Sequence, residues 1–315
     1  MRRALLVGID DYDFGPLTGC VNDATNMAEL LSHNEDGLPN FDCKLITAPD
    51  EYISKSSFHE QIKILFGNEA DVALLYFAGH GTSDDLGGSL VTQDSSKGDE
   101  GIAMRDVLSL ANKSKVREVV IILDCCFSGS FGSTPELDED KAILREGVSI
   151  LTATRASQPA VEIGGGGLFT FLVRNALSGG AADICGNVTV AGVYAYIDQA
   201  LGAWEQRPLF KSHVSRFTPL RKCNPDIELS ILRLLAKYFP NPDYKIKLDP
   251  SYEPDAEPKN EERQEIFSHL QKYRASRLVV PIGEEHMYYA AMNSKSCKLT
   301  PIGQYYWYLA DRGKI

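Results

Sequence analysis

The chain of 315 residues is 43% hydrophobic, which supports a full buried core and, at this length, one large domain with a smaller one. Its 43 acidic residues outnumber 32 basic ones, giving a formal net charge of -11. This balance disfavours binding to nucleic acid or to an anionic membrane surface, and it favours a basic substrate or partner.

The amino terminus and the cysteines indicate a cytoplasmic protein. The apolar run after Arg2 and Arg3 lasts about seven residues before Asp10, too short for a signal peptide. No stretch approaches the roughly 18 apolar residues of a membrane span. The seven cysteines are an odd number without a secretory signal, so we expect reduced thiols. They include no Cys-x-x-Cys pair, and we expect no zinc site.

Short apolar runs alternate with helical patterns in the first two thirds of the chain. The runs predict buried strands at residues 4–9, 44–47, 72–77, 119–123 and 148–152. The helical patterns predict helices at residues 23–33, 57–66, 104–112, 168–177 and 190–204. This alternation predicts an α/β fold with a mostly parallel, doubly wound sheet.

The pattern changes after residue 222. A helical stretch is followed by a segment rich in Pro, Asp and Glu, so we interpret residues 223–260 as a helix and linker. Residues 261–315 then contain a helix, a hairpin and a helix, which predicts a small α+β module similar to a winged helix. These elements are expected at residues 261–274, at 278–281 with 287–292, and from Thr300-Pro301 onward.

Two groups with catalytic chemistry follow the third and fourth predicted strands. His80 lies in Gly79-His80-Gly81, and Cys126 lies 46 positions further on, two residues after Asp124. Because the carboxyl ends of parallel strands meet at one crevice, we expect both side chains there. An imidazole can take the proton of a thiol and return it to a leaving amine. The backbone N–H groups of Gly81 and Cys126 are candidates for an oxyanion hole.

Each residue alone is more often structural than catalytic, because buried cysteines are usually inert and single histidines usually serve in hydrogen bonding. The joint placement at two neighbouring strand ends favours catalysis.

Four ordered segments carry a resemblance to a known family. LLVGIDDY, LTGCVNDA, LLYFAGHG and VVIILDCCFSGS resemble the successive blocks of caspase-like cysteine peptidases, closest to metacaspases and their bacterial relatives. The resemblance spans residues 1–222 and implies a caspase-like three-layer sandwich. It implies that Cys126 is the nucleophile, with Cys125 as the lesser candidate, and that His80 is the acid and base.

The same resemblance implies a substrate preference. Asp23 and Asp124 match the acidic residues that line the family's pocket for the side chain before the cut, so this pocket should select Arg or Lys. Caspases that cut after Asp carry an arginine where this chain has Leu17. The alternative role for Asp23 is that of a helix N-terminal residue favoured by the helix dipole.

Other positions depart from the metacaspase pattern. Ala78 stands where a pocket serine is common, and Phe127 where a histidine often follows the nucleophile. The family's calcium-binding cluster has no residue-by-residue match, so we expect no metal or other cofactor and leave calcium dependence open. The acidic run from Glu136 to Asp140 is more typical of a solvated loop than of a metal site.

Residues 127–147 occupy the place of the processing loop of caspase-like enzymes. Lys141 and Arg145 are its only basic residues. We expect either self-cleavage at one of them or an ordinary flexible connection.

The carboxy-terminal segment is rich in tyrosine. We expect most of these rings in the core of the module, although rings beside His286, Asn293 and Lys298 also suit a ligand or partner. The segment resembles extensions of bacterial caspase-like proteins, which implies that a small-molecule or protein activator binds here. DNA binding by a winged helix is the competing interpretation, and the acidic balance disfavours it.

The resemblance therefore implies a caspase-like cysteine endopeptidase that cleaves proteins after Arg or Lys, a regulated bacterial protease of stress response, cell death or antiphage defence. The alternative is a catalytically silent caspase-like scaffold or a signal-binding interaction protein, against which the presence of His80 and Cys126 argues. A nucleotide-binding domain is disfavoured because the first strand leads into Gly8-Ile9-Asp10-Asp11, which lacks the glycine fingerprint.

Overall fold

The computed structural model describes residues 1–84, 87–97, 99–125, 143–153, 162–163, 166–201 and 208–315. Contacts between Cα atoms divide the chain into two compact units. The first unit comprises Met1–Ala182 and Asn187–Asn224, and the second comprises Asp183–Gly186 and Pro225–Ile315. No helix among the described residues is long and apolar enough to cross a membrane. The expected division at residues 222 and 260 stays a prediction.

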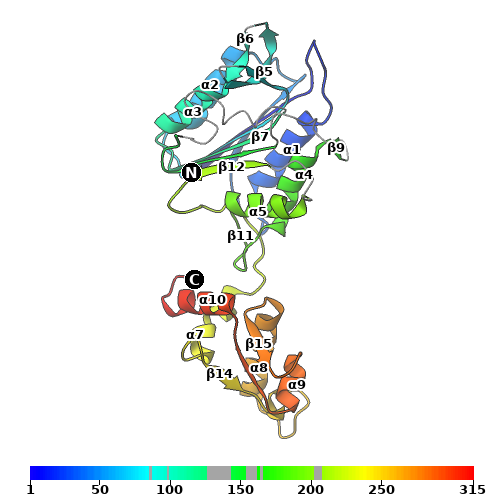
Figure 1. The fold of residues 1–315 in the computed structure, drawn as a ribbon, viewed down its shortest axis with the longest axis vertical. Helices are drawn as coiled ribbons and strands as arrows, with labels where there is room; N and C mark the ends of the chain where they lie inside the picture. The colour runs from blue at the N-terminus through cyan, green and yellow to red at the C-terminus, as the bar shows by residue number, and fades with distance from the viewer. Residues whose placement is uncertain (85–86, 98, 126–142, 154–161, 164–165, 202–207) are drawn as a thin grey trace. The chain divides into compact units, whose positions relative to one another are not determined.

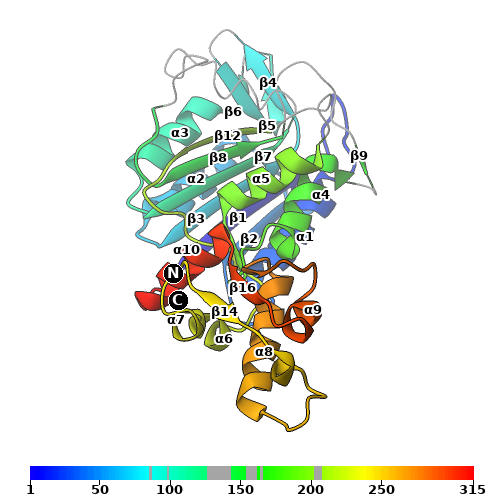
Figure 2. The ribbon, with the colours of Figure 1, turned by 60° about the horizontal axis from the view of Figure 1, so that its bottom comes forward.

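A six-stranded sheet forms the centre of the first unit, in the order β12-β8-β7-β3-β1-β2 (Figure 2). Its strands are β1 (Arg2–Ile9), β2 (Asp42–Ala48), β3 (Val72–Ala78), β7 (Glu118–Asp124), β8 (Val148–Thr152) and β12 (Leu209–His213). Neighbours pair in parallel, except that β12 is antiparallel to β8. The mostly parallel α/β sheet predicted from the sequence is confirmed.

Helices cover both faces of this sheet and complete three layers (Figure 1). The helices α2 (Lys55–Gly67) and α3 (Met104–Lys113) lie on one face, and α1 (Cys20–Ser32), α4 (Leu168–Asn175) and α5 (Val190–Ala200) lie on the other. Successive residues of a strand therefore enter different cores. In β3, Phe77 packs with the α2/α3 core and Tyr76 with the α1/α4/α5 core.

Several strands of the first unit were not predicted. A second, antiparallel sheet consists of β4 (Gly81–Asp84), β5 (Gly87–Ser96) and β6 (Asp99–Ala103). These strands are polar and rich in glycine, and only short apolar stretches such as Leu90 and Val91 reach the core, so their pattern has no clear period. Three smaller pieces complete the unit: β9 (Glu162–Ile163) paired with β10 (Gly166–Gly167), β11 (Asn187–Val188) paired with β13 (Arg221–Lys222), and a π-helical turn (Ala176–Gly180).

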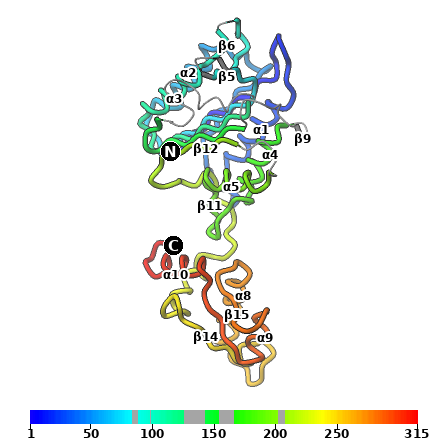
Figure 3. The backbone as a smooth tube through the Cα atoms, in the orientation of Figure 1, coloured from blue at the N-terminus to red at the C-terminus, as the bar shows by residue number. Residues whose placement is uncertain are grey.

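The second unit is a three-stranded antiparallel sheet packed against helices. Figure 3 traces the backbone of this unit. Its elements are α6 (Leu229–Arg233), α7 (Leu235–Tyr238), β14 (Lys245–Lys247), a 3₁₀ turn (Pro250–Tyr252), α8 (Glu261–Ala275), β15 (Val279–Ile282), α9 (Met287–Met292), β16 (Ser296–Leu299) and α10 (Pro301–Asp311). The segment expected to be a helix and linker supplies α6, α7 and β14.

The expected hairpin at residues 278–281 with 287–292 is wrong, because the second segment is the helix α9 and β15 pairs with β16 instead. Met287, Ala290 and Ala291 are buried at helical spacing. A six-residue apolar run is ambiguous between a strand and a buried helix, which explains the error.

Candidate functional site

His80 lies at the carboxyl end of the central sheet, two residues beyond the end of β3. Its Nε2 atom lies 2.7 Å from the carbonyl oxygen of Gly15. A carbonyl oxygen can only accept, so Nε2 carries the hydrogen and donates it. In the neutral ring Nδ1 then holds a lone pair and can act as a base.

The loop after β1 holds the imidazole on several sides. The rings of Tyr12 and Phe14 lie against it, with centroids at 4.7 and 5.5 Å. The buried Tyr12 hydroxyl accepts the backbone N–H of His80 at 3.2 Å and donates to the Val91 carbonyl at 3.2 Å. These contacts fix both the backbone and the ring of His80. Neither Tyr12 nor Gly15 was singled out from the sequence.

Gly81, a candidate for the oxyanion hole, begins β4 and is buried. It stands opposite Leu90 of β5, and the adjacent Val91 N–H donates to the His80 carbonyl at 3.0 Å. This bond makes Gly81 and Leu90 a non-hydrogen-bonded pair, so the Gly81 N–H is directed away from β5. That orientation suits a donor to an external oxygen atom.

Two adjacent cysteines, Cys125 and Cys126, follow β7. Cys126, the candidate nucleophile, lies outside the described residues. Cys125 is 5% exposed and belongs to the core between the sheet and the helices α2 and α3. Such a position suits a packing residue better than a nucleophile. Ala78 of β3 pairs with Asp124 of β7. In sequence, His80 comes two residues after Ala78 and Cys126 two residues after Asp124.

Asp23 and Asp124 meet at the backbone of Gly166 and Gly167. The Gly167 N–H donates to Asp23 Oδ2 at 2.8 Å. A methyl group on Gly167 would lie 2.5 Å from Asp124 Oδ2, and one on Gly166 would collide with Asp23 Oδ1. Only glycine lets this backbone pass so close to both carboxylates.

A chain of hydrogen bonds between buried groups supports Asp124. Thr170, in the first turn of α4, donates from Oγ1 to Asp124 Oδ2 at 2.6 Å. The Tyr76 hydroxyl lies 2.6 Å from the same Oγ1. A carboxylate can only accept, so Thr170 uses its hydrogen on Asp124 and Tyr76 donates to Thr170. Both Tyr76 and Thr170 are fully buried.

Burial dominates the electrostatics of the two carboxylates. It raises the pKa of Asp23 to about 6; the Gly167 N–H and Arg174 oppose the increase, and the charge of Asp124 adds to it. Burial also raises the pKa of Asp124, against the hydrogen bond from Thr170. Among the described residues, neither carboxylate forms an ion pair with Lys or Arg. A buried and a half-buried acid with no ion-pair partner in the described part of the chain favour a cation that arrives from outside.

Asp23 lies in the first turn of α1, where the helix dipole favours its charge, as the alternative role requires, and Asp10 caps the same helix end. The Asp10 carboxylate accepts the N–H groups of Cys20 at 2.9 Å and Val21 at 3.3 Å, at the amino end of α1. Burial and the nearby carboxylates, that of Asp10 foremost, raise the pKa of the Cys20 thiol. The Asp23 side chain also accepts the Gly167 N–H, so its position is compatible with both the pocket role and the helix-dipole role.

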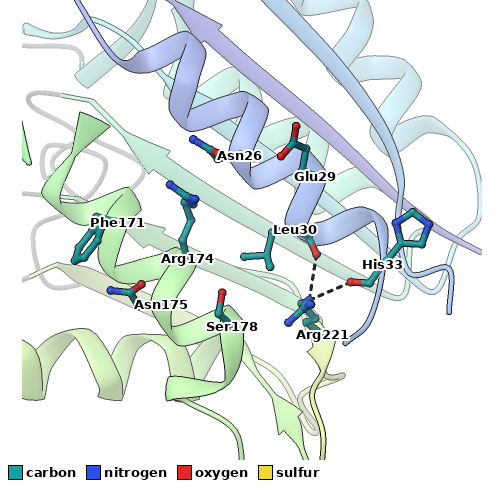
Figure 4. A pocket seen from close by; sticks show the side chains of 9 residues that line it. All are labelled: Asn26, Glu29, Leu30, His33, Phe171, Arg174, Asn175, Ser178 and Arg221. Carbon is teal, nitrogen blue, oxygen red and sulfur yellow. Dashed lines mark hydrogen bonds between the residues drawn. The ribbon is translucent and has the colours of Figure 1, made fainter. Parts of the chain in front are cut away.

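A separate cavity of about 370 Å³ lies in the groove between α1 and α4 (Figure 4). Its lining begins one helical turn after Asp23 and continues to His33, so it extends away from the strand ends. Arg221 crosses its end and donates to the carbonyl oxygens of Leu30 at 3.1 Å and His33 at 3.0 Å. We interpret this arginine as structural.

The two candidate cleavage sites also differ. Lys141 lies outside the described residues, as does the acidic run from Glu136 to Asp140. Arg145 donates to the carbonyl oxygens of Ala111 at 3.1 Å and Val116 at 2.6 Å, near the end of α3. Its guanidinium is therefore engaged within the protein. Within the described part of the chain, no three His, Cys, Asp or Glu side chains are grouped so as to hold a metal ion.

The six aromatic residues between Tyr288 and Tyr308 fall into two groups. Tyr306 and Trp307 are buried, and Trp307 Nε1 donates to the Phe239 carbonyl at 2.6 Å. The other four tyrosines are exposed, contrary to the expectation that most would lie in the core: Tyr288, Tyr289, Tyr305 and Tyr308. Of the polar neighbours, His286 and Lys298 are exposed and Asn293 donates to Glu284.

Comparisons with known proteins agree with this architecture. The family model described as the caspase domain matches residues 1–217. A crystal structure of a protein from Geobacter sulfurreducens, 16% identical, covers 71% of this chain and 97% of its own with a TM-score of 0.51. Caspase-1 from Spodoptera frugiperda, 14% identical, covers 70% of this chain and 90% of its own, also with a TM-score of 0.51. Such identities carry the fold alone. No curated protein matches the chain.

Proposed function

We propose, from the premise that the chain belongs to the caspase-domain family of cysteine peptidases, that it is an endopeptidase cutting proteins after Arg or Lys. The observation that carries the substrate preference is the pair of buried Asp23 and half-buried Asp124. Each is bonded to a neutral donor, the Gly167 N–H or the Thr170 hydroxyl, and within the described ranges neither is in an ion pair. A guanidinium or ammonium group of a substrate would supply the opposite charge.

In the proposed reaction His80 Nδ1 takes the proton of the Cys126 thiol, and the thiolate attacks the carbonyl carbon of the scissile bond. The Gly81 N–H donates to the oxyanion that forms. The imidazolium then protonates the leaving amine as the C–N bond breaks, which leaves a thioester on Cys126. Water, deprotonated by the same Nδ1, hydrolyses the thioester and restores the thiol.

The hydrogen bond from Nε2 to the Gly15 carbonyl supports this assignment of roles, because it leaves Nδ1 as the basic nitrogen. The burial of Cys125 among the α2/α3 core residues supports Cys126 as the nucleophile. The reaction needs no cofactor, and equal activity in EDTA and in calcium is the expected result.

We also propose that the enzyme is regulated. Self-cleavage at Lys141 or Arg145 would process the loop after Cys126, and the occupied Arg145 guanidinium favours Lys141. The second unit is the proposed receiver of a small-molecule or protein activator. A cytoplasmic bacterial protease of stress response, cell death or antiphage defence fits these features.

The test is cleavage of fluorogenic peptides that differ only in Arg, Lys or Asp before the cut. The wild type should cleave the Arg and Lys peptides, and Cys126→Ala and His80→Ala should each lose at least about a thousandfold in kcat/KM. Cys125→Ala is the matched control and should remain active.

Preferred cleavage after Asp would overturn the assignment of the acidic pocket. Equal activity of Cys126→Ala and wild type would overturn the nucleophile. No cleavage of any peptide by a folded wild type, with or without calcium, would favour the catalytically silent scaffold instead.

A further inference from the structure

Two lysines stand directly opposite each other on the sheet of the second unit. Lys245 of β14 pairs with Lys298 of β16 in the antiparallel ladder. Both are exposed, and they alternate with Ile246 and Cys297, which are buried in the core. The two ammonium groups therefore share the open face of the sheet. Like charges at directly opposite positions of a ladder repel each other.

The lysine pair belongs to a local positive region. Lys247 lies on the same open face, two residues along β14. Within the described part of the chain, none of the three lysines is in an ion pair. The residues Pro225–Ile315 contain 13 acidic and 13 basic side chains, so their net charge is zero. The positive charge of the three lysines is therefore local to this part of the sheet.

A cavity of about 530 Å³ opens beside the two lysines. This volume lies in the range of small-molecule sites. Val280, which stands opposite Lys298 on β15, and Pro301 provide the apolar wall. Lys245 and Lys298 provide the cationic side. All of the lining residues belong to the second unit.

The wall of the cavity is held in place by Gln304 of α10. Its Nε2 donates to the Pro242 carbonyl and to Asp243 Oδ1, each at 3.1 Å. These bonds tie the loop before β14 to the helix. They also engage Asp243, the one acidic residue of the lining. The cavity is thus formed before any ligand arrives, which lowers the entropic cost of binding.

We propose that this cavity binds a small molecule that carries phosphate groups. Lys245 and Lys298 contact the phosphate oxygens, and Val280 and Pro301 contact the remainder of the molecule. Lysine binds phosphate as a point charge, and a bound dianion would relieve the repulsion between the two facing lysines. The beginning of α10, capped by Thr300, adds a weaker positive potential on the same side.

The experiment is isothermal titration calorimetry on the full chain, with inorganic pyrophosphate and ATP as probes. If ATP binds more tightly than pyrophosphate, the apolar wall contributes to binding. If the two affinities are equal, only the phosphate groups contribute. The dissociation constant should rise at least about tenfold in Lys245→Gln and in Lys298→Gln, and with increasing salt. Lys298→Arg keeps the charge and should retain binding.

The matched control is Lys272→Gln, which removes an exposed lysine from α8 on the same unit. It should bind as the wild type does. Failure of both probes to bind at millimolar concentration overturns the proposal, as does equal binding by Lys245→Gln, Lys298→Gln and Lys272→Gln. Because binding is read without cleavage of any peptide, a failure here is distinct from a failure of the proposed peptidase activity.

Discussion

Thr170→Val is the substitution that tests most directly how the acidic pocket keeps its charge. Valine has nearly the shape of threonine but lacks the hydroxyl that donates to Asp124 Oδ2 at 2.6 Å. The Tyr76 hydroxyl loses its acceptor in the same step. Burial already raises the pKa of Asp124 and Thr170 opposes that increase, so the substitution should raise this pKa further.

The expected magnitude follows from the kind of bond removed. A hydrogen bond to a charged group contributes about 1.5–3 kcal/mol. If that energy supports the ionised form of Asp124, its loss weakens binding of a basic side chain roughly 10- to 150-fold. The unpaired Tyr76 hydroxyl should also lower the free energy of unfolding by about 1–3 kcal/mol.

The assay is calorimetry with a peptide that ends in Arg and with its citrulline counterpart, on a Cys126→Ala background that removes catalysis. Citrulline keeps the shape of arginine without its charge, so the ratio of the two dissociation constants reports the charge of the pocket alone. Thr170→Val should lower this ratio roughly 10- to 150-fold, with the remaining preference for arginine due to Asp23. Thr170→Ser keeps the hydroxyl and should preserve it.

A ratio in Thr170→Val within about twofold of the parent, in protein shown to be folded by its thermal unfolding, would refute the reasoning. Asp124 would then have to hold its charge without Thr170.

Three further predictions concern neighbouring residues. Because the pKa of Asp23 is about 6, its carboxylate becomes protonated as pH falls, so binding of the Arg peptide should weaken roughly tenfold between pH 7 and pH 5, and calorimetry should find a smaller change in Asp23→Asn. Tyr12→Phe removes both bonds of a buried hydroxyl and should lower the midpoint of thermal unfolding and kcat, with KM unchanged in steady-state kinetics. Gly167→Ala places a methyl group 2.5 Å from an oxygen of Asp124 and should cost about 1–3 kcal/mol in denaturant unfolding, whereas Gly67→Ala, with no atom within 4 Å, should not.

The positions of the central strands and of the site residues could be predicted because both follow from the continuous apolar runs in the sequence. Strands buried on two faces are continuous apolar runs, and the residues that follow them stand at one edge of a parallel sheet. His80 follows β3 and Asp124 is the last residue of β7, and these two strands are neighbours in the sheet. Their approximate placement therefore required only the strand order along the chain.

The supporting contacts could not be predicted, because they join residues that are far apart in sequence. Gly15 and His80 are separated by 65 positions, and Tyr76 and Thr170 by 94. The positions of Tyr76 and Thr170 in the hydrophobic pattern do not distinguish them from other core residues. Only the packing of α4 on the sheet brings the Thr170 hydroxyl to a carboxylate.

At the carboxyl end of the central sheet, uncharged carbonyl and hydroxyl groups surround His80, whereas the charged carboxylates lie at Asp23 and Asp124. Among the described residues, the ring and the backbone N–H of His80 bond to the carbonyl of Gly15 and the hydroxyl of Tyr12, and the His80 carbonyl accepts the Val91 N–H; all three partners are uncharged. The carbonyl orients the imidazole ring without placing a full charge beside it. The negative charges are instead gathered at Asp23 and Asp124, where burial makes them costly until a cation binds. In the proposed enzyme a basic substrate residue relieves that cost, so the charge of the site selects the substrate and the proton of the dyad remains free to move between sulfur, nitrogen and the leaving amine.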